Sequence, residues 1–379
     1  LAVGGVEVIG ICDVDSEHLA ASIDKIESIQ GSRPKAFKDY EELLELKDLE
    51  AIFIGTQPHW HALQFVAACE KGLHIYCEKP LAYDVAEGKA MIEANAKAGN
   101  IVQIGFQRRQ SEAFKRIKDF IESGKAGEIS QVEAQIHYNP NILDTTIQAP
   151  PASLDWEAWC GPAPKLDYRP SIGHKAWRLE KEYGNGHLVD WGIHHMDIVR
   201  VILGLDMPHR FQANGSLKKL AGKITTPDTL NASMLFDGCT LKWQHRLWGT
   251  GDINKQYNNG VFFYGEKATI FGSDQKMVIL ENEKDAEVIV EEIPMKDMRE
   301  RHMAVFLDAV KANDKNKIDC PVSDAFKSTA LVQLATIAYN TKSELKWDAT
   351  RQKIIDNKGA SAQLARPYRK GYKRPGQMS

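Results

Sequence analysis

The chain has 379 residues, of which 43% are hydrophobic, and its formal net charge at pH 7 is -3. This length and composition predict two globular domains, each with enough apolar residues to build a core. The near balance of charge gives no broad attraction to nucleic acid or to an anionic membrane. No apolar run approaches the roughly 20 residues that span a bilayer. Neither nucleic acid nor a membrane is therefore expected as a partner.

From residue 6 to residue 106 the sequence alternates strand-like and helix-like patterns. A buried strand over residues 6–12 is followed by a helix over residues 16–29, for which Ser16 is the expected N-cap. The other expected elements are helix 40–46, strand 51–55, helix 61–71, strand 74–78, a helix that ends at Gly99, and strand 101–106. This alternation predicts a Rossmann-type, doubly wound parallel sheet in an α/β fold.

Asp13 directly follows the first expected strand. In dinucleotide-binding sheets an acidic residue at this point accepts hydrogen bonds from the adenosine ribose hydroxyls. A carboxylate there favours NAD over NADP, because Asp13 and Asp15 would repel a 2′-phosphate. The alternative is that Asp13 only opens a turn toward Ser16.

The glycine-rich GxGxxG loop that usually accompanies such a sheet is absent. A first strand, its glycine turn and its helix would need about 30 residues before Val6, and five are present. In the usual strand order the missing strand is central, so its loss would leave its neighbours unpaired. We therefore expect that Leu1 is not the natural start and that the glycine loop lies upstream.

After Arg109 the pattern changes to one of many strands. A helix over residues 112–123 leads into a strand over residues 129–138, and helices over residues 298–313 and 323–341 close the pattern. Further strands are expected over residues 210–216, 229–236, 240–248, 261–264, 268–271, 277–280 and 287–290. These predict an α+β domain with an open, mostly antiparallel sheet. The expected domain bounds are 1–109, 110–345 and, for a C-terminal helix and a loose tail from Arg366, 346–379.

Glu78-Lys79-Pro80 follows the strand expected over residues 74–78. Open α/β sheets bind ligands outside the carboxyl ends of their strands, so Lys79 is a candidate to meet a substrate. The pKa of a lysine falls readily on desolvation, which would let Lys79 exchange a proton near neutral pH. Pro80 disfavours an α conformation at Lys79 and holds it extended. The alternative is a solvated lysine that closes a strand.

Asp190 and His194 are four residues apart, so they share one face if the segment is helical. A carboxylate beside an imidazole stabilises its protonated form and orients it, as proton transfer requires. The alternative is that Asp190 caps the helix while His194 packs against the other domain. A metal site formed by His59, His61, His194 and His195 is not expected, because the six cysteines form no CxxC pair and no HExxH pattern is present. The cysteines are interpreted as small buried hydrophobic residues.

Taken together, these segments resemble the Gfo/Idh/MocA family, the glucose-fructose oxidoreductase and inositol dehydrogenase group, over nearly the whole chain. Residues 56–61 stand where the family has a TPxxxxH-like turn, and residues 78–80 match its EKP motif. Asp190 and His194 match the DxxxH pair of the family's second-domain helix. In the turn, Pro58 comes one place later than usual, so only Thr56 and His61 carry over.

The resemblance implies a Rossmann domain that binds NAD or NADP and a second domain whose open sheet forms homodimers or homotetramers. It also implies hydride transfer at a sugar or polyol carbon, with Lys79 and His194 handling the hydroxyl proton and Asp190 orienting the site. Cofactor contacts are then expected from Asp13, Thr56, His61, Glu78, Lys79 and Gln107. Candidate substrate contacts are Arg108, Arg109, Tyr138, Trp177, Arg178 and His195. The Trp177 ring either stacks on a sugar or is simply buried.

The main interpretation is an NAD(P)-dependent dehydrogenase that acts on a CH–OH group of a sugar, sugar derivative or cyclitol. One alternative is an NAD-retaining, redox-neutral glycosidase, in which transient oxidation acidifies a neighbouring C–H bond and allows elimination of the glycosidic substituent. Another is a non-catalytic, sugar-responsive binding protein, although a sensor has no need of a proton-transfer set. The stretches LDWEAWCGPAP and EYGNG resemble a bacterial branch often exported behind a twin-arginine signal, so a cytoplasmic or periplasmic location stays open.

Overall fold

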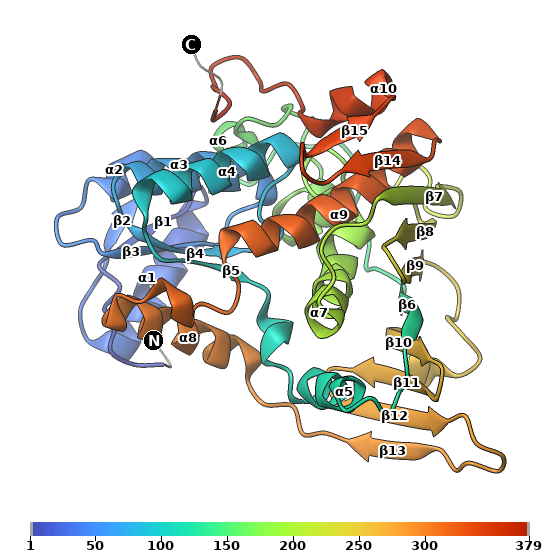
Figure 1. The fold of residues 1–379 in the computed structure, drawn as a ribbon. Coiled ribbons are helices and arrows are strands. Elements are labelled where there is room, and N and C mark those ends of the chain that lie inside the picture. Colours follow the sequence, from blue (N-terminus) through green and yellow to red (C-terminus); the bar gives the residue numbers. More distant parts are fainter. Residues whose placement is uncertain (1–2, 377–379) are drawn as a thin grey trace.

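A computed structural model describes residues 3–376 and shows two small parallel sheets beside one large sheet (Figure 1). β1 (Gly10–Cys12) pairs with β2 (Lys35–Phe37). β3 (Ala51–Ile54), β4 (His74–Glu78) and β5 (Val102–Gly105) form the second parallel sheet, with β4 in the centre. The Rossmann-type arrangement is confirmed, and within residues 3–376 β1 and β3 do not pair with each other. The expectation about what precedes Leu1 lies outside the described residues.

Four helices accompany these strands: α1 (Ser16–Gln30), α2 (Tyr40–Leu44), α3 (Pro58–Glu70) and α4 (Val85–Ala98). Asp15, not Ser16, is the N-cap of α1, because Asp15 Oδ1 accepts hydrogen bonds from the backbone N–H groups of residues 17 and 18. The first strand is shorter than expected, since Val6 is exposed and pairing begins at Gly10. The three-residue strand β2 was not predicted at all.

The rest of the chain forms one ten-stranded sheet. Its strands are β6 (Ile129–His137), β7 (Arg210–Ser216), β8 (Thr229–Leu235), β9 (Thr240–Arg246), β10 (Asn259–Gly265), β11 (Ala268–Ser273), β12 (Lys276–Glu281), β13 (Ile289–Glu292), β14 (Leu345–Asp348) and β15 (Lys353–Ile355). Their order is β13-β12-β11-β10-β6-β9-β8-β7-β14-β15. Neighbours are antiparallel except β6 and β9, which are parallel, so the predicted mostly antiparallel sheet is confirmed. The predicted domain bounds stay a prediction.

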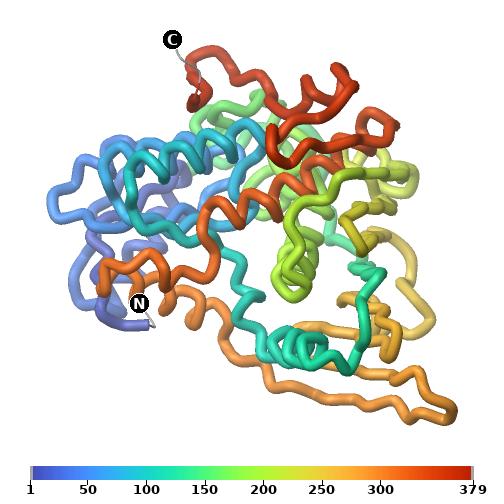
Figure 2. Tube along the Cα trace, viewed as in Figure 1, coloured from blue at the N-terminus to red at the C-terminus, as the bar shows by residue number. Residues whose placement is uncertain are grey.

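Helices cover this sheet and connect it to the N-terminal part (Figures 1 and 2). α5 (Glu112–Glu122) packs on β11 and β12, and α9 (Val322–Thr341) contacts β7, α4 and α7 (Ile193–Leu203). α8 (Met298–Ala312) returns to β5 and to the short helix η1 (Gln107–Gln110). Two further single turns are η5 (Lys255–Tyr257) and η6 (Lys315–Lys317). No helix within residues 3–376 is long and apolar enough to cross a membrane.

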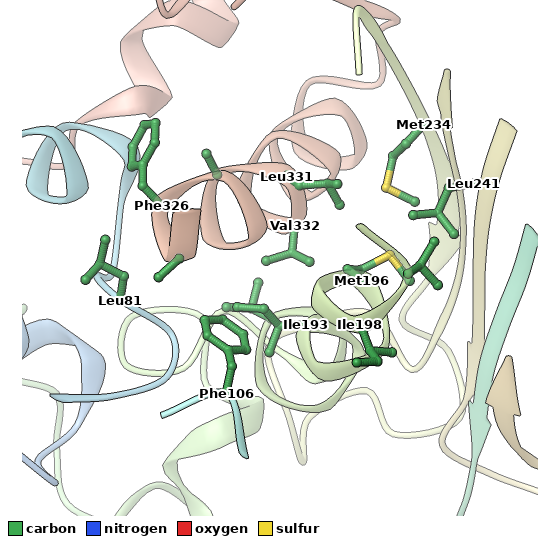
Figure 3. Packing of buried hydrophobic residues seen from close by; sticks show 14 of the residues in the cluster. Leu81, Phe106, Ile193, Met196, Ile198, Met234, Leu241, Phe326, Leu331 and Val332 are labelled. Atoms are coloured by element: carbon green, nitrogen blue, oxygen red, sulfur yellow. The ribbon is translucent and has the colours of Figure 1, made fainter. Parts of the chain in front are cut away.

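A continuous buried cluster joins the N-terminal part to the large sheet. Figure 3 shows Leu81, which lies just beyond β4, beside Phe326 of α9, while Ile193 of α7 lies below Val332. Each such side chain contributes about 1.5–3 kcal/mol when fully buried. The loop after β4 and the start of α7 are therefore held in place by the same apolar core. All six cysteines are free and five of them are buried, as the sequence predicted.

Residues 138–187 cross back over the N-terminal part and carry a second, aromatic cluster. This segment contains α6 (Trp156–Cys160), η2 (Pro170–Ile172) and η3 (His174–Leu179). The rings of Trp156 and Trp159 stack with centroids 4.6 Å apart, and Tyr183 packs edge-on against both. Gly161 has φ +51°, and a Cβ atom there would overlap the indole of Trp60 on α3. Glycine therefore permits this segment to dock closely on α3.

The C-terminal segment is ordered up to residue 376, which corrects the expected loose tail. The β14–β15 hairpin extends the sheet from residue 345, and within the segment where a helix was expected the short helix α10 (Lys358–Ser361) and the turn η7 (Ala362–Leu364) follow. Arg374 donates to both carboxylate oxygens of Asp84 at 2.9 and 2.6 Å. Tyr368 donates to Glu87 Oε1 at 2.8 Å. Burial, followed by the charge of Asp84, raises the pKa of Glu87 to about 7. Residues 377–379 of the predicted tail lie outside the described residues.

Candidate active site

Lys79 lies where the chain leaves the carboxyl end of β4, and it meets Asp190 from the second part of the chain. The Lys79 Nζ atom is 3.0 Å from Asp190 Oδ1 and also donates to the Asp190 backbone carbonyl. The two side chains are 15% and 6% exposed, so water screens this ion pair only weakly. The peptide bond between Lys79 and Pro80 is cis. The structure thus places the EKP lysine at the carboxyl end of β4, as the sequence predicted, and its contact with a substrate stays a prediction.

Asp190 sits in a π-helical turn, η4 (Leu188–Gly192), that leads directly into α7. π-Helical turns are rare and are frequent at functional sites. Arg178, from η3, holds the same carboxylate, with its Nε 3.1 Å from Asp190 Oδ2. Two cations from separate segments, Lys79 and Arg178, therefore fix the position of Asp190 and neutralise its charge.

His194 is not paired with Asp190, which corrects the expected carboxylate–imidazole contact. Both oxygens of Asp190 face Lys79 and Arg178, and His194 Nδ1 has no hydrogen-bond partner within residues 3–376. Burial, with the positive charges of Lys79 and Arg108, holds the pKa of His194 well below its usual range. The imidazole is therefore neutral near pH 7, with a nitrogen free for a ligand, rather than protonated.

The turn after β3 is tied to the EKP loop through His61. His61 Nδ1 is 2.9 Å from the carbonyl of Pro80, and His61 Nε2 is 3.0 Å from the carbonyl of Thr56. The Thr56 hydroxyl is itself used by Gln64, at 2.8 Å. Both ring nitrogens of His61 thus contact backbone oxygens, which suits a residue that positions the loop. Cofactor contact by Thr56 and His61 stays a prediction.

Glu78 and Gln107 form a second polar pair at the ends of β4 and β5. Gln107 Nε2 donates to Glu78 Oε1 at 2.9 Å and to the Tyr76 hydroxyl at 3.2 Å, and burial raises the pKa of the Glu78 carboxyl. Asp13 follows β1, as expected, and its Oδ1 accepts the backbone N–H of Asp15 at 2.9 Å. All these groups follow the carboxyl ends of parallel strands, the edge at which such sheets bind nucleotides.

The residues at this edge fit a nicotinamide dinucleotide. A carboxylate at Asp13 suits ribose hydroxyls, and the amide of Gln107 and the hydroxyl of Thr56 are polar groups at neighbouring strand ends. His194 offers a buried nitrogen that no group within residues 3–376 satisfies, and buried polar groups normally have a partner. A bound ligand would supply that partner.

Among the predicted substrate contacts, Tyr138, Trp177 and Arg178 lie on the Asp190 side of the site. The Arg178 guanidinium lies over the Trp177 ring, 4.7 Å from its centroid. The pKa of Tyr138 is raised to about 12, first by burial and then by the charge of Asp190. Tyr138 remains 39% exposed. These three side chains are therefore near enough to the Lys79 pair to meet a substrate there.

Arg108, Arg109 and His195 bind other groups of the protein, and substrate contact by these three residues stays a prediction. Arg108 pairs with Asp274 at 2.8 Å, and His195 Nε2 is 3.0 Å from Asn259 Oδ1. All three guanidinium nitrogens of Arg109 bind protein oxygens. These contacts could not be predicted from the sequence, because they depend on partners far away in the chain.

His187 is a further candidate site residue, which the sequence alone did not single out. It is 1% exposed, and neither ring nitrogen has a hydrogen-bond partner in the described part of the chain. Its ring lies between Tyr138, at 4.9 Å, and His245, at 5.1 Å between centroids. The one available signal was its position three residues before Asp190, which a helix would place nearby.

Two family models match the chain. One, described as "Oxidoreductase family, NAD-binding Rossmann fold", matches residues 2–106. The other, described as "Oxidoreductase family, C-terminal alpha/beta domain", matches residues 141–374. The chain belongs to the Gfo/Idh/MocA oxidoreductase family. The resemblance inferred from the EKP and DxxxH motifs is thereby confirmed.

Curated relatives of this oxidoreductase include inositol dehydrogenases. Inositol 2-dehydrogenase of Salmonella typhimurium is 37% identical over 142 residues, which are 37% of this chain and 41% of that protein. Myo-inositol 2-dehydrogenase of Thermotoga maritima is 26% identical over 300 residues, covering 79% of this chain and 74% of the relative. The match to the Salmonella protein thus spans about two fifths of its length.

Solved structures share the fold across most of the chain. Levoglucosan dehydrogenase, in complex with NADH and levoglucosan, superposes with a TM-score of 0.68 at 17% identity, covering 89% of this chain and 90% of that one. Aldose-aldose oxidoreductase from Caulobacter crescentus, complexed with glycerol, gives a TM-score of 0.68 at 18% identity with the same coverage. At these identities the likeness shows the fold alone, and it agrees with the predicted fold class.

Proposed function

We propose that this oxidoreductase is a nicotinamide-dependent dehydrogenase that transfers a hydride to or from a carbinol carbon of a sugar, sugar derivative or cyclitol. The observation that carries the proposal is the shielded Lys79–Asp190 pair, 3.0 Å apart, at the carboxyl ends of parallel strands and near a neutral His194. Relatives named inositol 2-dehydrogenase support a polyol or sugar as the substrate class.

NAD is the proposed cofactor in preference to NADP. Asp13 follows β1, and its carboxylate suits the ribose hydroxyls of NAD but would repel a 2′-phosphate. Thr56, Glu78 and Gln107 would line the nicotinamide end, while His61 would act by holding the EKP loop. When bound, the nicotinamide would accept or supply the hydride.

Lys79 and His194 are proposed to manage the hydroxyl proton. His194 is in its basic form, because burial and nearby cations lower its pKa, and a neutral imidazole can accept a proton. The Lys79 ammonium, fixed by Asp190, would donate a hydrogen bond to the same substrate oxygen and stabilise its developing negative charge. Arg178 holds Asp190 from the other side and so keeps the carboxylate turned toward Lys79. Tyr138 and Trp177 would face the sugar.

The test uses the purified full-length protein. The nucleotide released on denaturation would be identified, and NADH absorbance would then be followed with free sugars, cyclitols including myo-inositol, and glycosides. NADH formation with a free sugar or polyol is the expected result. Glycoside cleavage with retained NAD and no net NADH would identify a redox-neutral glycosidase instead. A protein without nucleotide and without turnover would support a binding role and overturn the proposal.

We further propose that the chain forms a homodimer or homotetramer through its large sheet. Exposed apolar side chains gather near the β12–β13 edge, where Leu280, Val288, Ile289 and Val290 are 45–54% exposed, and such patches mark interaction surfaces. Light scattering on the eluted protein is expected to give two or four times the chain mass of 42.5 kDa. A single-chain mass at micromolar concentration would contradict this proposal.

A further inference from the structure

Asp15, His18 and His174 come together beside the carboxyl end of β1, outside the Lys79 site. Asp15 uses Oδ1 to cap α1, at 3.0 Å from the backbone nitrogen of Glu17. Its other oxygen, Oδ2, lies 2.8 Å from His174 Nε2. His18 stands on the first turn of α1, with its ring centroid 4.6 Å from that of His174. One nitrogen or oxygen atom from each residue lies within 4.8 Å of the others.

The two histidines reach this point from separate segments that are held in register. The backbone N–H of Ser16 donates to the carbonyl of Ser153 at 2.9 Å, and the backbone N–H of Asp155 donates to the carbonyl of Val14 at 3.0 Å. His174 follows in the same crossing segment, and its φ of +35° lies in the left-handed region that non-glycine residues seldom adopt. Strained residues of this kind cluster at ligand and functional sites.

We infer that Asp15, His18 and His174 form a binding site for a divalent transition-metal ion, with Zn²⁺ as the best fit. Two imidazoles and one carboxylate are a common three-ligand set for zinc, with water in the fourth position. Zinc bonds of about 2.0–2.2 Å in tetrahedral geometry place ligand atoms roughly 3.4 Å apart and the two ring centroids about 5 Å apart. The ring centroids of His18 and His174 are 4.6 Å apart, close to the expected separation. Asp15 Oδ2 and His174 Nε2 are 2.8 Å apart and would separate slightly on binding, and the ligand atom of His18 lies within 4.8 Å of the others.

Metal binding would require a small movement of the ligand side chains, and His18 is the residue that can move. Asp15 is 3% exposed and His174 is partly buried, whereas His18 is exposed on the helix surface and can change rotamer at little cost. Asp15 forms no ion pair with lysine or arginine within residues 3–376, so no cation competes with a metal ion for Oδ2. The bound ion would fasten residues 153–174 to the start of α1, next to Asp13.

The experiment uses full-length protein without a histidine tag, treated with a chelator and then titrated with Zn²⁺ by calorimetry. One ion per chain is expected, together with a rise in melting temperature at saturating Zn²⁺. Residues that only support a metal ligand typically contribute 10- to 100-fold in affinity. Loss of a ligand in His18→Gln or His174→Gln is therefore expected to weaken binding by at least about 100-fold.

The matched control is His209→Gln, because His209 is a surface histidine near Asp237, at 3.5 Å, on another part of the chain. This variant should bind Zn²⁺ as the parent does. Co²⁺ provides a second readout, since a tetrahedral site with bound Co²⁺ absorbs strongly in the visible range and the absorption should vanish in His18→Gln. A parent protein that binds no Zn²⁺, or unchanged binding in both ligand variants, would show that Asp15 and His174 form a simple hydrogen bond and would overturn the inference.

Discussion

Replacing Lys79 by methionine tests the proposed proton-transfer role most directly. Methionine keeps the length of the side chain and removes the ammonium group. Asp190 is left 6% exposed, but Arg178 Nε still lies 3.1 Å from it, so the carboxylate is not stranded. A lost hydrogen bond to a charged group costs about 1.5–3 kcal/mol, well below the 3–5 kcal/mol expected for an orphaned buried charge. The variant should therefore fold.

The effect on turnover should be larger than the effect on stability. General acid–base groups contribute about 100- to 10,000-fold in rate, which corresponds to roughly 3–5 kcal/mol of activation free energy. We expect kcat for the best sugar or polyol to fall within this range, with little change in the dissociation constant for NAD. Lys79→Arg should also be slow, because the larger, planar guanidinium cannot place an N–H group where the compact ammonium of Lys79 lies.

The assay combines initial rates of NADH formation, nucleotide binding and thermal unfolding. Lys71→Met is the matched control, since Lys71 forms an exposed pair with Glu45, the two side chains being 44% and 70% exposed. It should leave all three readouts nearly unchanged. A Lys79→Met protein that binds NAD and turns over within threefold of the parent would refute the assignment of Lys79 to the chemical step.

Three further substitutions test how the site is supported. Burial and the charge of Asp84 raise the pKa of Glu87 in the folded chain from its usual 4.5 to about 7, so between these pH values the folded chain retains a proton that the unfolded chain releases, and the free energy of unfolding falls as pH rises. Glu87→Gln should remove this pH dependence, worth at most roughly 3 kcal/mol, in melting curves at pH 5 and pH 8. Arg374→Ala breaks a buried bidentate ion pair and should lower the free energy of unfolding by about 3–5 kcal/mol. Arg351→Ala, at a side chain 71% exposed, should lower it by less than about 1 kcal/mol. Equal losses of stability in denaturant titrations would contradict the burial of Arg374. Gly161→Ala should lower the free energy of unfolding by more than Gly72→Ala. Both glycines have positive φ, but a Cβ at Gly161 would overlap Trp60, whereas a Cβ at Gly72 would meet open space. Denaturant titrations of the two variants would compare the losses.

Periodicity sufficed for most of the fold because the elements concerned bury one regular face. Strands β8 and β9 of the large sheet alternate buried positions with more exposed ones along their length, and that pattern is visible in the sequence. β2 escaped prediction because it has three residues, none fully buried. The tail was misread because its arginines look solvated in sequence, whereas Arg374 is buried against Asp84.

The site was predicted in part for a similar reason. Lys79 follows from a local motif, since its place at a strand end is set by neighbouring residues. The partner of Asp190 does not follow from a local motif. An α-helical spacing suggested that Asp190 contacts His194, whereas in the structure Asp190 lies in a π-helical turn and its carboxylate binds Lys79 and Arg178, which belongs to η3. Contacts across about 110 residues of chain have no short-range signature.

The proposed proton-transfer set exists only while the two parts of the chain are packed together. Lys79 comes from β4 and Asp190 from the turn before α7, and their relative position depends on the core that Leu81, Ile193 and Val332 share. Arg109 reinforces this joint, because it pairs with Asp197 of α7 at 2.6 Å from within η1. A substitution at Arg109 would thus lower activity by displacing α7 and Asp190, with a loss of stability, and not by removing a contact to the sugar. In this oxidoreductase the interface that stabilises the fold is also the one that positions the proposed chemistry.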